Sequence, residues 1–232
     1  MNNASTLRRY SYADLPSLIA LMTGDEKHDL ASMSTLDVIW ALYDRVLRVS
    51  PSTAGSESRD RFYLSKGHGP MAYYAVLAAK GFIMPDDLAR YGRFDSLLGQ
   101  HPDRNLVPGA EISSGSLGHG LPLAVGTALG LRAMGLTSDR VFVLTGDGEL
   151  DEGSGHEAIA FGGRAGIDSL HCVVVDNSSA SLGWPGGIET RFAAEDWSTV
   201  RADGRDHDAL EAAFTLPHPG RPHAVIAVIN RA

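Results

Sequence analysis

The chain has 232 residues, of which 44% are hydrophobic and 21% charged, which is the composition of a globular protein with one substantial core. Its net charge is −8 and no run of lysine and arginine stands out, which argues against nucleic acid or an anionic membrane as a partner. The single cysteine, Cys172, lies in an apolar run and excludes an internal disulfide framework.

The beginning of the sequence resembles neither a leader nor a membrane anchor. It has no sustained apolar run before a small-residue cleavage site, and no window approaches the roughly 18 apolar residues of a membrane span. We therefore expect a cytoplasmic protein without a targeting segment. Residues 1–12 are expected to form a loose arm, and residues 13–232 a single domain.

Most of the first half is predicted to be helical, because apolar residues recur there at helical spacing. The expected helices span residues 34–49, 70–81 and 117–135. The last of them is almost uncharged before Arg132, which predicts burial nearly all round. Two glycine-rich loops, "LSKGHG" and "SSGSLGHG", join these helices.

The second half alternates short β-branched runs with helical stretches. The runs are typical of buried parallel strands. Strands are expected at 141–144, 170–175, 197–200 and 224–229, with helices at 153–166 and 206–214. This order predicts an α/β fold: an open, mainly parallel sheet with helices on both faces and ligands at the carboxyl ends of the strands.

Polar groups follow two of the predicted strands. Asp147 lies in a Gly-Asp-Gly turn after the first strand of this half, and Asn177 follows the next strand. Adjacent parallel strands end side by side, so a carboxylate, an amide and a loop carbonyl can form a hard oxygen site for Mg²⁺ or Ca²⁺. The glycines would let backbone N–H groups approach phosphates. Taken alone, the motif is more often an ordinary strand-to-helix turn, and the neighbouring Glu149 and Asp151 are expected to be solvated or capping groups.

Together with Asn177, the Gly-Asp-Gly turn resembles the thiamine diphosphate binding motif. The segments "DRFYLSKGHGPMAYYAVLAAKG" and "GQHPDRNLVPGAEISSGSLGHGLPLAVGTALG" resemble two segments of transketolases. The similarity runs from about residue 18 to residue 228, in the order of the amino-terminal, diphosphate-binding domain of that family. It implies the thiamine diphosphate-binding fold.

The resemblance implies roles for residues that match the family's motifs. Asp147, Asn177 and the backbone carbonyl of Ser179 would bind the metal. His28 and His101 would line the substrate channel as catalytic histidines, which can donate, accept or carry a proton. Cofactor contacts are expected from His68, the Gly148 N–H, backbone groups of Gly115, Ser116 and Leu117, and the side chains of Glu152 and Arg205.

The resemblance also implies the activity and a partner. In the family, thiamine diphosphate with Mg²⁺ moves a two-carbon ketol unit from a ketose to an aldehyde acceptor. The glutamate that activates the cofactor lies in a pyrimidine-binding domain, which these 232 residues do not contain. We therefore expect activity only with a second subunit that carries the pyrimidine-binding and carboxyl-terminal domains, in a heterotetramer of two plus two.

Three departures from the family pattern concern the substrate side. Arg205 replaces a histidine in "DGRD", His119 replaces a glutamine, and "SASLGWPGG" replaces a polar loop. Arginine can pair with phosphate but cannot act as a general base. These changes favour a specialised small sugar or ketose substrate.

Other functions remain open at this point. A thiamine enzyme that transfers an acyl group from, or decarboxylates, a 2-oxoacid also uses Gly-Asp-Gly with a downstream Asn. A non-catalytic subunit is the second alternative. An NAD-binding protein is disfavoured, because "GDGELDEG" does not match the G-x-G-x-x-G fingerprint.

Overall fold

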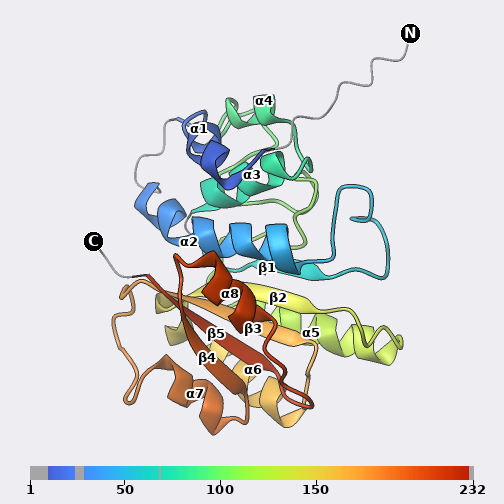
Figure 1. Cartoon of the computed structure of the whole chain (residues 1–232), viewed down its shortest axis with the longest axis vertical. Coiled ribbons are helices and arrows are strands. Elements are labelled where there is room, and N and C mark those ends of the chain that lie inside the picture. The colour runs from blue at the N-terminus through green and yellow to red at the C-terminus, as the bar shows by residue number, and fades with distance from the viewer. Residues whose placement is uncertain (1–9, 24–28, 68, 230–232) are drawn as a thin grey trace.

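Five parallel strands form the centre of the molecule. The computed structural model describes residues 10–23, 29–67 and 69–229. The strands lie in the order β1-β2-β3-β5-β4, and every neighbouring pair is parallel (Figure 1). Their bounds are β1 Arg61–Leu64, β2 Val141–Gly146, β3 Leu170–Asp176, β4 Ser198–Asp203 and β5 His223–Val228. The predicted open parallel sheet is confirmed.

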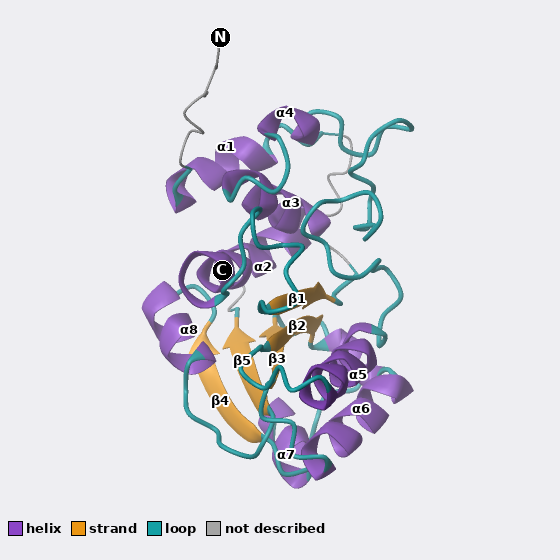
Figure 2. Ribbon diagram, turned by 90° about the vertical axis from the view of Figure 1, so that its right-hand side faces the viewer, coloured by secondary structure: helices purple, strands orange, loops and turns teal. Residues whose placement is uncertain are grey.

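Alternation along the strands assigns each side chain to one of two cores. In β2, Phe142 and Leu144 pack into one core, and Val141 and Val143 into the other. The first core lies against α2 (Asp29–Ala41) and α8 (His207–Phe214), and α1 (Leu15–Ile19), α3 (Pro70–Ala79) and α4 (Pro85–Leu88) continue that layer away from the sheet (Figure 1). The opposite face is covered by α5 (Gly120–Ala133), α6 (Gly153–Arg164) and α7 (Ile188–Ala194) (Figure 2). Helices therefore cover both faces, as predicted.

Sequence patterns missed strand β1 and helices α1, α4 and α7. Strand β1 has only four residues, too few for a clear periodic signal, and it is a strand because it pairs with β2. Helix α7 follows the "WPGG" turn and has seven residues. The first long helix begins at Asp29 rather than Ser34 and continues into a π-helical turn at Leu42–Val46.

The prediction that the uncharged helix is buried nearly all round is wrong for α5. Leu123 is 50% exposed, and Gly126 and Gly130 are exposed as well. The opposite side of α5 packs on the sheet and on α6. The described part of the chain thus leaves the outer side of α5 uncovered.

The expected loose arm has a helical turn at its end. Residues 1–9 lie outside the described part of the chain, but Tyr12 begins a 3-10 helix at Tyr12–Asp14 and donates a hydrogen bond from its hydroxyl to Asp37 at 2.5 Å. In the described ranges, no helix has the length and apolarity needed to cross a membrane.

Candidate functional site

The Gly-Asp-Gly turn lies at the carboxyl end of β2, as predicted. Asp147 is buried, and its backbone N–H donates to the Val175 carbonyl of β3 at 3.1 Å. Its Oδ2 accepts the Ser179 and Ala180 N–H groups at 2.6 and 3.0 Å, and its Oδ1 accepts the Ser179 hydroxyl at 2.5 Å. The loop after β3 is thereby folded back over Asp147.

This loop brings the three predicted metal ligands to one edge of the sheet. Asn177 follows β3 directly, and Ser178, with φ of 57°, turns the chain so that Ser179 reaches Asp147. A carboxylate, an amide and a carbonyl are the hard oxygen donors that Mg²⁺ and Ca²⁺ prefer, so the residues present fit a divalent cation. Among the described residues, no three His, Cys, Asp or Glu side chains gather to hold a metal, so the set would depend on amide and carbonyl oxygens.

Gly148 leaves room beside the same loop. A Cβ on Gly148 would lie 3.6 Å from the carbonyl and the hydroxyl oxygen of Ser179. The glycine therefore keeps its backbone open next to the proposed metal ligands, as a close approach of phosphate oxygens requires.

Glu149 corrects the expectation that it is solvated or a cap. It is 4% exposed and turns inward in the 3-10 helix Gly148–Asp151. Its carboxylate accepts the Ser65 hydroxyl, the Gly118 N–H at 2.9 Å and the Gly146 N–H at 3.4 Å. Burial raises its pKa, and these hydrogen bonds oppose that shift. Glu149 thus joins the end of β1, the loop before α5 and the Gly-Asp-Gly turn.

Lys66 is a buried cation at this edge that sequence reasoning did not single out. Its ammonium donates to the Ser34 hydroxyl of α2 at 2.8 Å. Its pKa is lowered to about 8 because burial penalises the charged form, while Asp147 and Glu149 act in the opposite direction. The signal available in the sequence was its place in "LSKGHG", one residue after Ser65.

The predicted cofactor loop lies across the carboxyl end of β1. Gly115 has φ of 126°, and a Cβ there would lie 3.1 Å from the imidazole of His101, so the ring packs directly on this backbone. Ser116 and Leu117 are exposed. The structure therefore brings His101 into contact with Gly115 of the predicted cofactor loop.

The same loop contacts the segment after the Gly-Asp-Gly turn. Gly118 has φ of 80°, and a Cβ there would lie 2.6 Å from the Cβ of Glu152. Its carbonyl accepts the Ser154 hydroxyl at 2.8 Å. Glu152, whose side chain is exposed, thus lies beside the loop before α5.

Arg205 is occupied by protein groups. Its Nη1 donates to the Met33 carbonyl at 2.6 Å and to Asp37 Oδ2 at 2.8 Å. Asp37 Oδ1 also accepts the Tyr12 hydroxyl and contacts His207 Nε2 at 2.9 Å. Asp37 was not a predicted site residue, since an acid within a helix has no sequence signature of its own. The cluster ties Arg205 to α2.

Two predicted site residues, His28 and His68, lie outside the described part of the chain. His156 of α6 packs against Trp184 of the "WPGG" turn with ring centroids 5.1 Å apart. The guanidinium of Arg191 lies over the same Trp184 ring, 4.3 Å from its centroid. The turn that replaces the family's polar loop is therefore held by ring contacts.

Comparison with known proteins supports the family suggested by this edge of the sheet. Residues 17–227 match the model described as "Transketolase, thiamine diphosphate binding domain". The chain is 35% identical to an apulose-4-phosphate transketolase subunit of Actinobacillus succinogenes over 207 residues, covering 86% of this chain and 75% of that protein.

A relative with higher identity has a different name. The protein "Ferredoxin fas2" of Rhodococcoides fascians is 55% identical over 222 residues, covering 96% of this chain and 73% of that protein. Iron–sulfur clusters are held by four cysteines in ferredoxins, whereas these 232 residues contain one. These 232 residues therefore lack the cysteines that a ferredoxin cluster requires.

A solved structure agrees in fold. The transketolase from Leishmania mexicana superposes with a TM-score of 0.77 at 22% identity, over 95% of this chain and 37% of that chain. The present chain thus spans little more than a third of that enzyme. By the match over residues 17–227 and by its identity to a transketolase subunit, the chain belongs to the transketolase family.

Proposed function

We propose that this chain is the diphosphate-binding subunit of a split transketolase, which transfers a two-carbon ketol unit from a ketose to an aldehyde with thiamine diphosphate and Mg²⁺. The observation that carries the proposal is the buried Asp147 carboxylate, fixed by donors from Ser179 and Ala180 beside Asn177. A pre-oriented carboxylate next to amide and carbonyl oxygens suits a cation that anchors a diphosphate.

Different residues at this edge of the sheet would bind different parts of the cofactor and its metal ion. Asp147, Asn177 and the Ser179 carbonyl would hold Mg²⁺, and the Gly148 N–H and His68 would bind diphosphate oxygens. When bound, thiamine diphosphate would supply the carbanion chemistry that no side chain supplies. Arg205, which cannot act as a base, would bind the diphosphate by exchanging its contact with Asp37 Oδ2 at 2.8 Å.

The loop before α5 and the two predicted channel histidines would contact the reacting end of the cofactor and the substrate. Backbone groups of Gly115, Ser116 and Leu117 would border the cofactor's rings. His101, which packs on Gly115, would donate to or accept from substrate oxygens, together with His28. Glu152 would face the cofactor where two subunits meet.

We also propose that activity requires a second subunit with the pyrimidine-binding and carboxyl-terminal domains, two copies of each chain forming the enzyme. The Actinobacillus relative supports this division of a transketolase between chains, because its name describes it as one subunit of such an enzyme. The substrates proposed are a ketose donor and an aldehyde acceptor.

The test is a donor screen with this chain, the second subunit, thiamine diphosphate and Mg²⁺. Ketol transfer from a ketose, abolished by chelation of Mg²⁺ and absent when either chain is omitted, is the expected result. Turnover of 2-oxoacids alone would replace the proposal with acyl transfer or decarboxylation. Calorimetry of the complex that detects no binding of thiamine diphosphate would replace it with a non-catalytic subunit, and full activity of this chain alone would refute dependence on a partner.

A further inference from the structure

Asp37 is a buried carboxylate on α2 with three partners from other segments. It is 4% exposed. Its Oδ1 accepts the Tyr12 hydroxyl at 2.5 Å and contacts His207 Nε2 at 2.9 Å, and its Oδ2 accepts Arg205 Nη1 at 2.8 Å. We call Tyr12, Asp37, Arg205 and His207 the Asp37 cluster. A buried carboxylate needs such partners, because burial of an uncompensated charge is costly.

Tyr12 and His207 are held in the Asp37 cluster independently of Arg205. Their rings meet edge to face with centroids 4.7 Å apart, and Tyr12 also packs against Trp40 of α2 at 6.1 Å. Burial raises the pKa of Tyr12, and its bond to Asp37 adds to the shift, so the phenol keeps its proton and remains a donor. Both rings use the same carboxylate oxygen, Oδ1, which leaves Oδ2 to Arg205.

Arg205 is held toward α2 by a single guanidinium nitrogen. Nη1 donates to Asp37 Oδ2 and to the Met33 carbonyl at 2.6 Å. In the part of the chain that the structure describes, neither Nε nor Nη2 of Arg205 has a hydrogen-bond partner, and the side chain is 44% exposed. The carboxylate beside Nη1 also offsets the positive charge that an anion would meet at Arg205.

The face of α2 that carries Asp37 extends toward the Gly-Asp-Gly turn. Ser34 lies one helical turn before Asp37, and its hydroxyl accepts the Lys66 ammonium at 2.8 Å. The Lys66 side chain lies along Gly146, because a Cβ on Gly146 would be 3.6 Å from Lys66 Cγ. One turn of α2 therefore separates the contact with Arg205 from the contact with this side of the turn.

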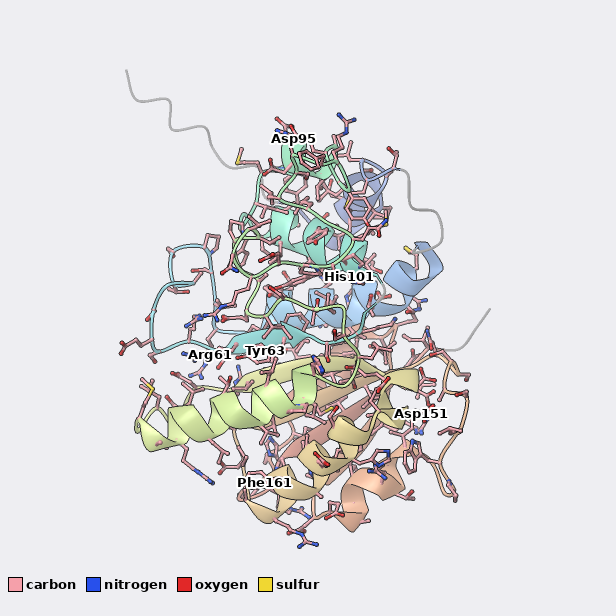
Figure 3. All side chains as sticks on the ribbon, turned by 180° about the vertical axis from the view of Figure 1, so that it is seen from behind. Arg61, Tyr63, Asp95, His101, Asp151 and Phe161 are labelled. Atoms are coloured by element: carbon pink, nitrogen blue, oxygen red, sulfur yellow. The ribbon has the colours of Figure 1, made fainter. Side chains whose placement is uncertain are left out.

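Arg205 leaves the sheet at the edge that carries the proposed metal site. It follows β4, which is parallel to β5 and ends with Asp203 paired with Val228. In Figure 3, Asp151 marks the segment after the Gly-Asp-Gly turn, and the first turns of α2 lie on the same side of the molecule. The Asp37 cluster is thus placed next to the edge where the cofactor's diphosphate is proposed to bind.

We propose that Asp37 is a positioning residue that competes with the diphosphate for Arg205, so that the Asp37 cluster sets the affinity for thiamine diphosphate. This inference rests on the proposed function, which brings a diphosphate to this edge. Arg205 would exchange Asp37 Oδ2 for phosphate oxygens, and the free energy of the lost contact would be subtracted from binding. Oδ1 would retain the Tyr12 and His207 contacts, so Asp37 would not become a buried charge without partners.

The competition gives Asp37 and Tyr12 opposite effects. Asp37→Asn can keep its amide oxygen at the Oδ1 position for Tyr12 and His207, whereas its NH₂ group then faces the Arg205 donor and releases the guanidinium. Tyr12→Phe keeps the ring but removes one donor from Asp37, so more of the carboxylate's charge is left to hold Arg205. A cluster that only stabilised the fold would weaken cofactor binding in both variants.

The test measures the dissociation constant of thiamine diphosphate by calorimetry, with Mg²⁺ and the second subunit present. Asp37→Asn is expected to tighten binding by about 5-fold, as for loss of a partly exposed ion pair that opposes it. Tyr12→Phe is expected to weaken binding by about 3-fold. Arg205→Gln is expected to weaken it by about 10-fold, because charge-assisted hydrogen bonds to the diphosphate are lost.

A double-mutant cycle distinguishes competition from a structural role. In the Arg205→Gln background, Asp37→Asn is expected to leave the dissociation constant unchanged, because the guanidinium for which Asp37 competes is missing. Asp208→Asn is the matched control. It removes the same charge from α8, where Asp208 pairs with Arg45 at 2.5 Å, and is expected to leave cofactor affinity unchanged.

Three outcomes would overturn the competition. They are unchanged or weaker cofactor binding by Asp37→Asn, unchanged or tighter binding by Tyr12→Phe, and an effect of Asp37→Asn that is the same with and without Arg205. Circular dichroism and urea unfolding show whether each variant is folded. If Asp37→Asn does not fold, the cycle of Tyr12→Phe with Arg205→Gln decides, since the effect of Tyr12→Phe must vanish without Arg205.

The proposed function is tested separately. Cofactor affinity that follows Asp37 and Arg205 in a complex that turns over no ketose retains the competition and refutes the function. Ketol transfer with a cofactor affinity that is insensitive to both residues does the reverse. A wild-type complex that binds no thiamine diphosphate refutes both.

Discussion

Ser179 binds both carboxylate oxygens of Asp147, with its N–H at 2.6 Å from Oδ2 and its hydroxyl at 2.5 Å from Oδ1. The two residues follow neighbouring strands, so this contact closes the edge of the sheet at the proposed metal site. A group that orients a ligating carboxylate affects the metal without touching it.

Ser179→Ala separates this orienting role from ligation, because the backbone carbonyl proposed as a ligand is retained. Loss of the hydroxyl is expected to weaken Mg²⁺-dependent binding of thiamine diphosphate by about 10-fold. Calorimetry of the assembled enzyme at several Mg²⁺ concentrations measures this change. Ser181→Ala is the control, since its hydroxyl contacts Asp151 at 3.3 Å. Equal affinities in both variants would contradict the prediction.

Glu149→Ala is expected to destabilise the fold, although sequence patterns place this acid in solvent. The substitution leaves the buried Ser65 hydroxyl and Gly118 N–H without their acceptor, at a cost of about 1–3 kcal/mol each. Urea unfolding of the isolated chain measures the loss. Glu157→Ala, at an exposed position of α6, is expected to change stability by less than about 0.5 kcal/mol. Similar values for the two variants would show that Glu149 is not buried in solution.

Gly118→Ala tests the contact between the cofactor loop and the segment after the Gly-Asp-Gly turn. Alanine is strained at φ of 80°, and its Cβ would lie 2.6 Å from that of Glu152, so a loss of about 1–3 kcal/mol or more is expected. Gly130→Ala is the control. It lies in a helix facing open space and is expected to stabilise the isolated chain by up to about 1 kcal/mol. Thermal and urea unfolding of both variants measure these opposite changes in the free energy of unfolding.

A cluster of histidines at the amino ends of the strands makes stability depend on pH. His171 is buried and stacks on Phe142, and His218 contacts it edge-on and stacks on His223. Burial holds the pKa of His171 well below its usual value, and repulsion from His218 and His223 adds to the effect. The pKa of His223 is lowered by burial as well.

The sign of the pH dependence follows from these lowered pKa values. Below the unfolded-state pKa of about 6.5, the unfolded chain binds protons that the folded chain excludes. The stabilisation that comes from keeping these histidines neutral is therefore complete above that pH, and the free energy of unfolding decreases as the pH falls below it. The slope is expected to approach about 1.4 kcal/mol per pH unit for each histidine. Urea unfolding between about pH 8 and pH 5 measures it. His171→Phe should make the slope shallower, whereas His119→Gln, at an exposed position, should not.

Most of the second half of the fold could be predicted from the sequence. Short β-branched runs such as residues 170–175 are typical of central strands of a parallel sheet, which are buried on both faces. Because such strands end at the same edge, the sequence alone predicted that Asn177 lies close to Asp147. The short strand β1 could not be predicted in this way, since its four residues form a strand only because β2 lies beside them.

The sequence by itself therefore determined four of the five strands, their shared carboxyl edge and the polar groups that follow them, because hydrophobic periodicity is a local property of the chain. Tertiary structure decided which polar side chains turn inward. Glu149 is buried because donors from two distant loops converge on it, and Arg205 is held by Asp37 because the loop after β4 meets α2. It also left one side of α5 uncovered, since burial depends on what packs against a helix, which its own residues do not specify.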